Sequence, residues 1–218
     1  MKKILAFDTS ASVLSLGLIV GDELFCAPVE DLGMRHSVTL LPAVEKLLAE
    51  NGILPNELDC IAVCVGPGSF TGIRIGVATA KAIALSLNIP CIAVNSLLLQ
   101  AYNKLDENGV LSLLDAKHGG FYAAAYDKSG EALLEPCFIQ GYADVFDAFP
   151  TVVCDQPSAV FDAVSKAGKT WEESRVQLPE KGGFLPLVKK LFEEGAFTSF
   201  EALEPLYLRK SQAEEGRP

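Results

Sequence analysis

Residues 60–72 read CIAVCVGPGSFTG, an unbroken apolar run followed by a loop that contains three glycines. A short apolar run without polar alternation is typical of a strand that is buried on both faces. The residues after the loop, Ile73 to Leu87, follow a helical pattern of apolar positions. The stretch therefore predicts a strand, a glycine loop and a helix in succession, as in α/β proteins.

Around this stretch, the order of three strands, helix, strand and helix occurs twice. The predicted strands are 4–7, 13–20, 23–29, 60–65, 91–94, 110–114, 121–126, 132–139 and 151–154. The predicted helices are 37–51, 73–87, 95–104, 144–149, 158–167 and 184–194. Gly52 should end the first of these helices, and Pro42 predicts a kink or a later start within it. Two mixed sheets flanked by helices predict the actin-like fold, an α/β architecture of two similar lobes.

The repeat also predicts the domain boundaries. We expect an N-terminal lobe over 1–105 and a C-terminal lobe over 106–202, with residues 203–218 packing back on the first lobe. Both lobes end their first strand in an aspartate, Asp8 and Asp115.

Polar residues at the first strand end and in the glycine loop form a candidate phosphate or nucleotide site. A carboxylate with neighbouring hydroxyls can hold a magnesium-bound phosphate, and a helix N-terminus offers free amides to an anion. The candidate residues are Asp8, Thr9, Ser10, Gly66, Gly68, Ser69 and Thr71. The alternative is structural, with a hairpin turn at 8–10 and a packing role for the loop. The loop matches neither a P-loop nor a dinucleotide fingerprint.

The helix after the loop carries small residues and apolar residues around its whole circumference. Gly72, Gly76 and several alanines would allow close approach of another helix, while isoleucines and leucines point in all directions. Such a helix must be covered on nearly every side. The cover is either the rest of the same subunit or a second subunit.

Composition and charge narrow the classes of function. The formal net charge is −10, which disfavours unaided binding of nucleic acid, because that needs clustered Lys and Arg. The apolar run 4–7 stops at Asp8, too early for a signal peptide, and we expect no membrane span. We therefore expect a soluble cytoplasmic protein whose six cysteines are mostly buried hydrophobes.

Metal and nucleophile motifs are weak in this sequence. Cys60 and Cys64 would lie about 13 Å apart on a strand, too far to share one zinc ion. His36 and His118 are the only histidines, and Leu40 stands four residues after His36, where a second ligand on a helix would be. No GxSxG or papain-like cysteine setting occurs.

Several motifs together resemble one family. ILAFDTS at 4–10, His36-Ser37 with Leu40-Leu41-Pro42, GPGSFTGIRIG at 66–76, Asp115-Ala116-Lys117 and PLYLR at 205–209 are similar to the TsaB (YeaZ) family. These motifs span the whole chain in the family's order.

The resemblance implies an actin-like, non-catalytic subunit that supports threonylcarbamoyladenosine formation at the adenosine next to the tRNA anticodon. Its catalytic relative TsaD carries an HxxxH metal motif, and Leu40 stands where the second histidine would be. The resemblance implies no metal and no cofactor of the chain's own, with ATP or ADP bound only weakly or at a complex interface. The turn at 154–158 also lacks the glycines that hold adenine in actin-like enzymes.

The resemblance further implies partners and an interface. The partners are TsaD in a heterodimer, the ATPase TsaE in a larger complex, a second copy in isolation, and tRNA only through the complex. The implied interface residues are His36, Leu40, Leu41, Val44, Gly72, Ile73, Ile75, Gly76, Thr79, Ala80 and Ile83. The alternatives are a stand-alone actin-like ATP-dependent transferase or kinase, and a metal-dependent peptidase.

Overall fold

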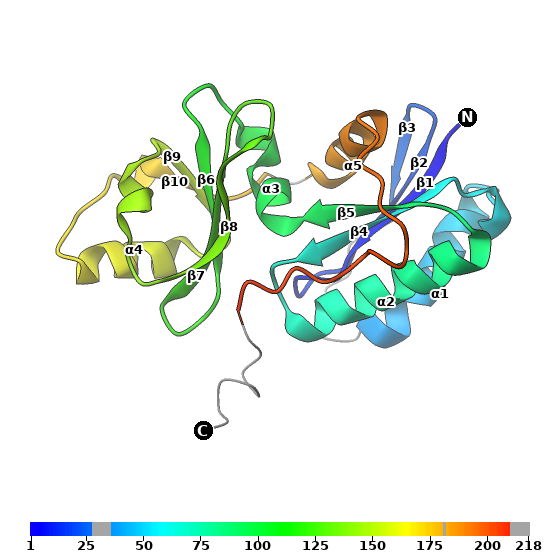
Figure 1. Cartoon of the computed structure of the whole chain (residues 1–218), viewed down its shortest axis with the longest axis horizontal. Helices are drawn as coiled ribbons and strands as arrows, with labels where there is room; N and C mark the ends of the chain where they lie inside the picture. Colours follow the sequence, from blue (N-terminus) through cyan, green and yellow to red (C-terminus); the bar gives the residue numbers. More distant parts are fainter. Residues whose placement is uncertain (28–35, 181, 210–218) are drawn as a thin grey trace. The chain divides into compact units, whose positions relative to one another are not determined.

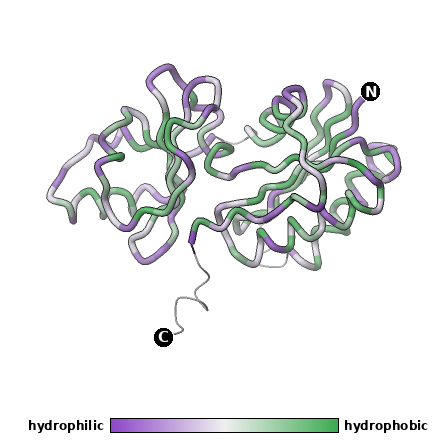
Figure 2. Tube along the Cα trace, in the orientation of Figure 1, coloured by the Kyte–Doolittle hydropathy of each residue, from purple (hydrophilic) through white to green (hydrophobic). Residues whose placement is uncertain are grey.

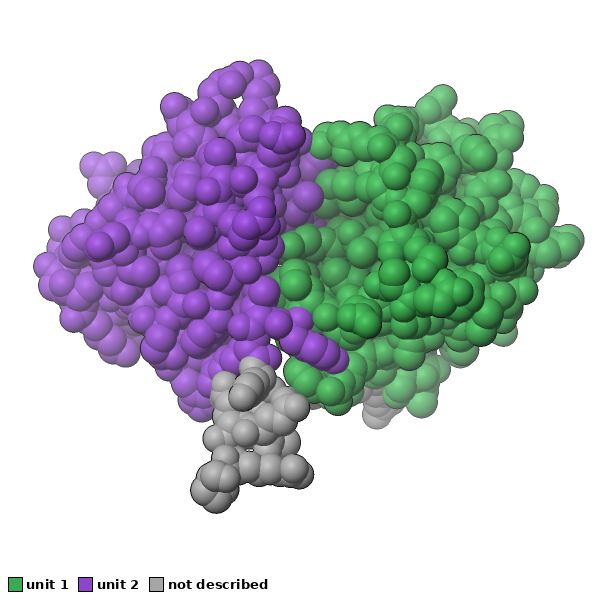
Figure 3. Space-filling view, viewed as in Figure 1, with its two compact units in different colours: residues 1–96, 184–206 green, residues 97–183, 207–218 purple. Residues whose placement is uncertain are grey.

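The computed structural model describes residues 1–27, 36–180 and 182–209, which divide into two compact units (Figure 3). Unit 1 holds residues 1–96 and 184–206, and unit 2 holds residues 97–183 together with the described residues from 207 onward. Each unit has its own five-stranded sheet and its own hydrophobic core.

The sheet of unit 1 joins an antiparallel meander to two parallel strands in the order β3-β2-β1-β4-β5 (Figure 1). Its strands are β1 (Lys3–Asp8), β2 (Ser15–Val20), β3 (Glu23–Cys26), β4 (Cys60–Gly66) and β5 (Cys91–Asn95). β1 pairs antiparallel with β2 and parallel with β4, which pairs parallel with β5. Every residue of β4 is buried, as its unbroken apolar run predicted, and Figure 2 shows green colouring along the central strands.

Helices cover both faces of this sheet. α1 (His36–Glu50) and α2 (Phe70–Leu87) contact each other and share one core with alternate residues of β1, β2 and β4. α5 (Phe184–Glu193) contacts β2 and β5. Gly17 points toward α5, because a Cβ atom there would lie 2.7 Å from a methyl carbon of Leu185.

Unit 2 repeats the plan, with strand order β10-β9-β6-β7-β8. Its strands are β6 (Val110–Asp115), β7 (Gly120–Tyr126), β8 (Ala132–Gln140), β9 (Thr151–Cys154) and β10 (Val176–Gln177). α4 (Pro157–Lys166) packs on one core, and α3 (Ser96–Ala101) packs on the other. The order of the first sheet therefore recurs strand for strand, which confirms the doubled mixed sheet of the actin-like fold.

Most predicted elements form, with differences at their ends. Helix α1 begins at His36 and runs through Pro42, so the predicted later start was wrong. Proline has no N–H, so the Val38 carbonyl lacks its usual donor within the helix. Both Pro42 and Val38 are exposed. Gly52 ends the helix in a left-handed conformation, as predicted. Short 3-10 helices at Pro55–Glu57, Tyr102–Lys104, Asp144–Asp147 and Glu173–Arg175 join the elements. The sequence pattern missed β10, and part of the third predicted strand lies outside the described residues.

Two boundaries differ from the predicted lobes. α3 packs on the second sheet, because the buried Gln100 side chain donates hydrogen bonds to Ser112 Oγ and to the carbonyls of Leu113 and Val153. α5 belongs to unit 1 rather than to the predicted second lobe, because its apolar side packs toward the first sheet.

The segment after α5 returns along unit 1. Thr198 exchanges two backbone hydrogen bonds with Cys91, and the Leu206 amide donates to the Val65 carbonyl. Lys81 on α2 donates to the carbonyls of Glu201 and Leu203. The predicted return of the chain at 203 thus begins earlier, and residues 207–209 belong to unit 2.

Candidate functional site

The glycine loop ends at a capped helix. Ser69 is the N-cap of α2, and its Oγ accepts a hydrogen bond from the Gly72 amide at 3.3 Å. The Ser69 amide in turn donates to the Ser10 carbonyl at 2.7 Å. Ser96 Oγ donates to the Pro67 carbonyl. The loop is therefore tied to neighbouring segments at several points.

The polar residues at the end of β1 lie directly against this loop. Asp8, Thr9 and Ser10 are all buried. Thr9 Oγ1 donates to the Gly72 carbonyl at 2.7 Å, and the Ser10 amide donates to Asp8 Oδ1 at 2.7 Å. Burial raises the pKa of the Asp8 carboxyl, while hydrogen bonds from Ser10 oppose that rise.

Three glycines spaced by four residues make this close approach feasible. A Cβ atom on Gly72 would lie 1.9 Å from the Thr9 carbonyl oxygen, and one on Gly76 would lie 2.4 Å from Thr9 Oγ1. A Cβ on Gly68 would lie 2.6 Å from the Ser10 carbonyl oxygen. The glycines are needed because the backbone of residues 9 and 10 lies on the loop and on α2.

This geometry favours the packing interpretation of the candidate phosphate residues. Asp8, Thr9, Ser10 and Ser69 form hydrogen bonds to each other and to the loop, and Gly68 holds the close contact. Gly66 is left-handed, and a Cβ there would lie 2.6 Å from Ile73 Cδ1. Thr71, by contrast, is exposed. The phosphate site stays a prediction that none of these contacts supports.

Burial divides the predicted interface residues into two sets. Those that face the inside of unit 1 are His36, Leu40, Val44, Gly72, Ile73, Gly76 and Ala80. Leu41 is 51% exposed, while Ile75, Thr79 and Ile83 are partly exposed. The residues of the first set pack within the unit, and their part in an interface stays a prediction; a bulky residue at position 76 would disturb folding before it disturbed association.

The outer face of α1 and α2 carries apolar residues that the sequence analysis did not select. Val38 is 67% exposed and Leu85 is 59% exposed. Ala78 and Ala82 are also exposed and Ile75 is partly exposed on the outer side of α2, while Val38 and Leu41 are exposed on α1. The helical spacing 75, 78, 82, 85 was the available signal, since it is the stripe opposite 73, 76, 77, 80 and 84.

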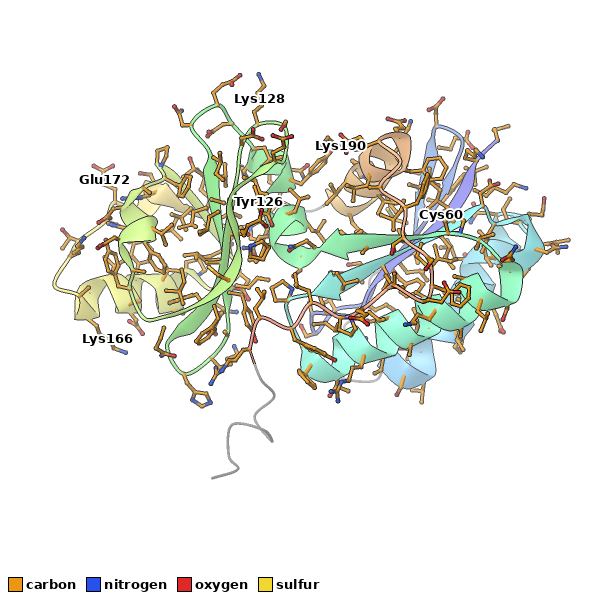
Figure 4. All side chains as sticks on the ribbon, in the orientation of Figure 1. Cys60, Tyr126, Lys128, Lys166, Glu172 and Lys190 are labelled. Carbon is orange, nitrogen blue, oxygen red and sulfur yellow. The ribbon has the colours of Figure 1, made fainter. Side chains whose placement is uncertain are left out.

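Histidine and cysteine residues have structural settings. His36 Nε2 lies 2.8 Å from the Ala11 carbonyl oxygen, and its buried Nδ1 has no partner among the described residues. Cys60 lies on β4 (Figure 4), and burial raises the pKa of its thiol to about 12. Within the described chain, no cluster of three His, Cys, Asp or Glu side chains is arranged to hold a metal ion. Cys26, predicted to be buried, is exposed, and Cys137 is only partly buried.

The second unit places Asp115 where the first unit has Asp8, at the end of the central strand. Its amide donates to the Asp155 carboxylate, and its own carboxylate accepts from the Lys117 amide and Nζ, both at 2.8 Å. α4 begins at Pro157, directly after Gln156. The chain thus enters α4 at a proline, and no glycine stands between Cys154 and Ser158.

One helix has the length and hydropathy of a membrane span, contrary to the expectation that none would. This helix is α2, over Phe70–Leu87. In the structure it packs on β4, with Ile73, Val77, Ala80 and Ala84 buried in the core of unit 1.

Comparisons with known proteins agree on one family. The family model of TsaD, the tRNA N6-adenosine threonylcarbamoyltransferase, matches residues 30–144. The chain is 31% identical to the tRNA threonylcarbamoyladenosine biosynthesis protein TsaB of Escherichia coli, over 97% of this chain and 96% of that protein. It is 42% identical to TsaB of Bacillus subtilis over 124 residues, which cover 56% of this chain and 54% of that protein.

A solved structure extends the match to the whole fold. YeaZ from Pseudomonas aeruginosa superposes with a TM-score of 0.78 at 26% identity, covering 95% of this chain and 100% of that one. The sequence match to TsaB likewise runs nearly from end to end in both proteins. The chain therefore belongs to the TsaB (YeaZ) family of tRNA threonylcarbamoyladenosine biosynthesis proteins.

Proposed function

We propose that this chain is the non-catalytic subunit that binds the transferase TsaD during threonylcarbamoyladenosine formation in tRNA. The observation that carries the proposal is the outer face of α1 and α2, called here the α1–α2 face: Val38, Leu41, Ile75, Ala78, Ala82 and Leu85. Large apolar side chains exposed on adjacent helices are typical of a protein interface. The match to the TsaD family model and to TsaB proteins supports TsaD as the partner.

The shape of the α1–α2 face supports a helical partner. Ala78 and Ala82 lie one turn apart on the exposed side of α2, so another helix can approach its backbone closely. Val38, Leu41 and Leu85 provide the large apolar side chains. Burying such side chains contributes about 1.5–3 kcal/mol each, enough for a few of them to dominate association.

The test is association with a TsaD protein, measured by light scattering and by calorimetric titration. We expect Leu41→Glu and Leu85→Glu each to weaken the heterodimer at least about tenfold, because each buries a carboxylate in an apolar contact. Both positions are exposed in the free chain, so thermal unfolding should change little.

Leu178→Glu is the matched control. Leu178 is 60% exposed, like Leu85, but belongs to unit 2. It should leave TsaD binding unchanged. Association that is equally strong in all three variants would overturn the assignment of the α1–α2 face, and no association of the unaltered chain would overturn the proposed function.

The same face would hold two copies together when TsaD is absent, so the two glutamate variants should also favour the monomer. TsaE and tRNA would join through the TsaD complex, and the cytoplasmic location stays a prediction. The alternative, a stand-alone ATP-dependent transferase or kinase, predicts tight binding and turnover of magnesium–ATP by the isolated chain. We expect neither, since Asp8, Thr9 and Ser10 form their hydrogen bonds within the protein.

A further inference from the structure

Unit 2 contains a cavity of about 460 Å³ between α4 and the turn that joins β6 to β7, called here the α4 cavity. Small residues face one another across it. Ala159 and Ala163 on α4 and Ala167 directly after it follow a spacing of four and line the cavity together with Gly119 and Gly141. The volume falls within the range of small-molecule sites, roughly 300–1,000 Å³.

The turn at the rim has an unusual backbone. Lys117, His118 and Gly119 are consecutive and all left-handed, with φ values of 66°, 53° and 75°. Two of them carry side chains, and such a conformation costs on the order of 1–3 kcal/mol for a non-glycine residue. Strain of this kind persists only where the surroundings impose it, and it is frequent where a side chain must be held toward a ligand.

Hydrogen bonds from three sides hold the turn in place. Asp115 accepts from the Lys117 amide, and Gln140 Nε2 donates to the His118 carbonyl at 3.0 Å. The Gly141 amide donates to the Gly119 carbonyl at 2.7 Å. The turn therefore presents the Lys117 and His118 side chains from a fixed backbone.

Among the described residues of unit 2, Lys166 differs from the other lysines and arginines in having no partner. Those with an ion pair, hydrogen bond or ring contact are Lys104, Lys117, Lys128, Lys169, Arg175 and Arg209. Lys166, at the end of α4 (Figure 4), lines the cavity, and so does His118, whose side chain also has no partner within the described chain. The basic groups without an internal role thus meet at one cavity.

We propose that the α4 cavity binds a phosphate ester of about mononucleotide size, with the phosphate held by His118 and Lys166. Lysine ammonium groups bind phosphate as point charges, and a neutral imidazole donates one hydrogen bond. The alanine and glycine floor leaves room for the ring that carries the phosphate. Asp162 also lines the cavity, and its negative charge lowers the affinity for an anion there. The charge of Asp115 is offset by its ion pair with Lys117.

A free nucleotide and the backbone of an RNA chain share this chemistry. The proposal goes beyond the proposed function and does not depend on it, because the cavity lies in unit 2 and the α1–α2 face lies in unit 1. Lys166→Ala should therefore leave TsaD association unchanged, so either idea can fail while the other holds.

The experiment is calorimetric titration of the full chain with 5′-AMP, adenosine and an unphosphorylated five-nucleotide uridine RNA. We expect 5′-AMP or the RNA to bind, and Lys166→Ala and His118→Ala each to weaken that binding at least about fivefold. Asp162→Asn should tighten it, because it removes a nearby like charge from the ligand's surroundings. Binding of the RNA but not of 5′-AMP would identify a chain phosphodiester as the ligand, and the reverse would identify a free nucleotide.

Lys128→Ala is the matched control, since Lys128 pairs with Glu107 and does not line the cavity. Fluorescence of Trp171, which packs in the same core as α4, verifies that each variant folds. Equal affinities for 5′-AMP and adenosine without RNA binding, equal effects of Lys166→Ala and Lys128→Ala, or no binding of any probe would each overturn the proposal.

Discussion

At the scale of single residues, the spacing of Gly68, Gly72 and Gly76 is explained by one neighbour. Each glycine faces the backbone or side chain of Thr9 or Ser10 at less than van der Waals distance for a Cβ atom. The sequence analysis recognised the glycines as special but related them to a phosphate or to another subunit. In the structure, residues 9 and 10 lie against these glycines within the same unit.

Gly72→Ala should destabilise unit 1. Helix propensity alone would favour alanine by about 1 kcal/mol. The new methyl group, however, would lie 1.9 Å from a backbone oxygen, which cannot rotate away. Overpacking usually costs about 1–3 kcal/mol, so we expect a net loss in the free energy of unfolding, measured in urea.

Ala82→Ser on the exposed side of the same helix serves as the control, because it also adds one heavy atom. It should change the unfolding free energy by less than about 0.5 kcal/mol. A Gly72→Ala variant as stable as the control would show that residues 9 and 10 do not lie against α2 as described.

At the scale of elements, a cluster around Asp147 fixes the segment that follows α4. The Asp147 carboxylate accepts from Tyr142, from Lys169 Nζ and from Trp171 Nε1, and Arg175 lies 4.0 Å from the Trp171 ring centroid. These bonds, led by that from Lys169, lower the pKa of Asp147 to about 2. The cluster joins the 3-10 helix at 144–147 to the residues that enter β10.

Stability should depend on this carboxylate in a defined pH window. A depressed carboxyl pKa stabilises the folded state above the unfolded value, about 3.9, and loses that effect as pH falls through the folded value. We expect Asp147→Asn to lower the melting temperature at neutral pH. The difference from the unaltered chain should shrink as pH falls from about 4 to about 2.

The neighbouring Asp144→Asn is the control for this series. Asp144 is exposed on the same 3-10 helix and makes no ion pair within the described chain. It should show little difference at any pH. Because Asp147 is about 40% exposed, solvent screening limits the effect, and high salt should reduce it further.

Sequence patterns predicted most of these elements because each pattern is local. The buried strand at 60–66 shows as an apolar run, and Gly52 marks the end of α1. β10 was missed since it has only two residues, and such a strand exists only through its pairing with β9. The effect of Pro42 was misjudged because the cost of leaving the Val38 carbonyl without its N–H donor depends on whether water can reach that carbonyl. The exposure of Val38 is a property of the folded chain.

At the scale of the whole molecule, the two units have separate cores built on the same strand order. The chain returns to unit 1 through α5, whose Leu185, Leu187 and Val188 are buried. Sequence order alone assigned this helix to the second lobe. Its place depends on an uncovered sheet face in unit 1, and Gly17 provides the space for Leu185.

Leu187→Ala should destabilise unit 1 by about 2–5 kcal/mol, because it leaves a cavity at a fully buried position. The single tryptophan, Trp171, lies in unit 2 and reports on that unit. We expect the far-UV circular dichroism transition to begin at lower urea, while Trp171 fluorescence changes later.

The reciprocal variant is Val160→Ala, in the core of unit 2. It should move the Trp171 fluorescence transition to lower urea, so that the fluorescence changes before the rest of the far-UV circular dichroism signal. If Leu187→Ala moved the fluorescence and circular dichroism transitions together, α5 would not be specific to unit 1, or the two units would unfold as one.

The sequence by itself determined the doubled α/β plan, the strand at 60–66 and the family, because apolar periodicity and contiguous motifs are local properties. The tertiary structure decided which side of each helix is free and which residues meet across the chain. It showed that Gly76 is internal while Leu85 is exposed, that Asp8 is buried, and that Lys166 and His118 line the same cavity. Such facts arise from contacts between distant segments, and a pattern along one segment does not contain them.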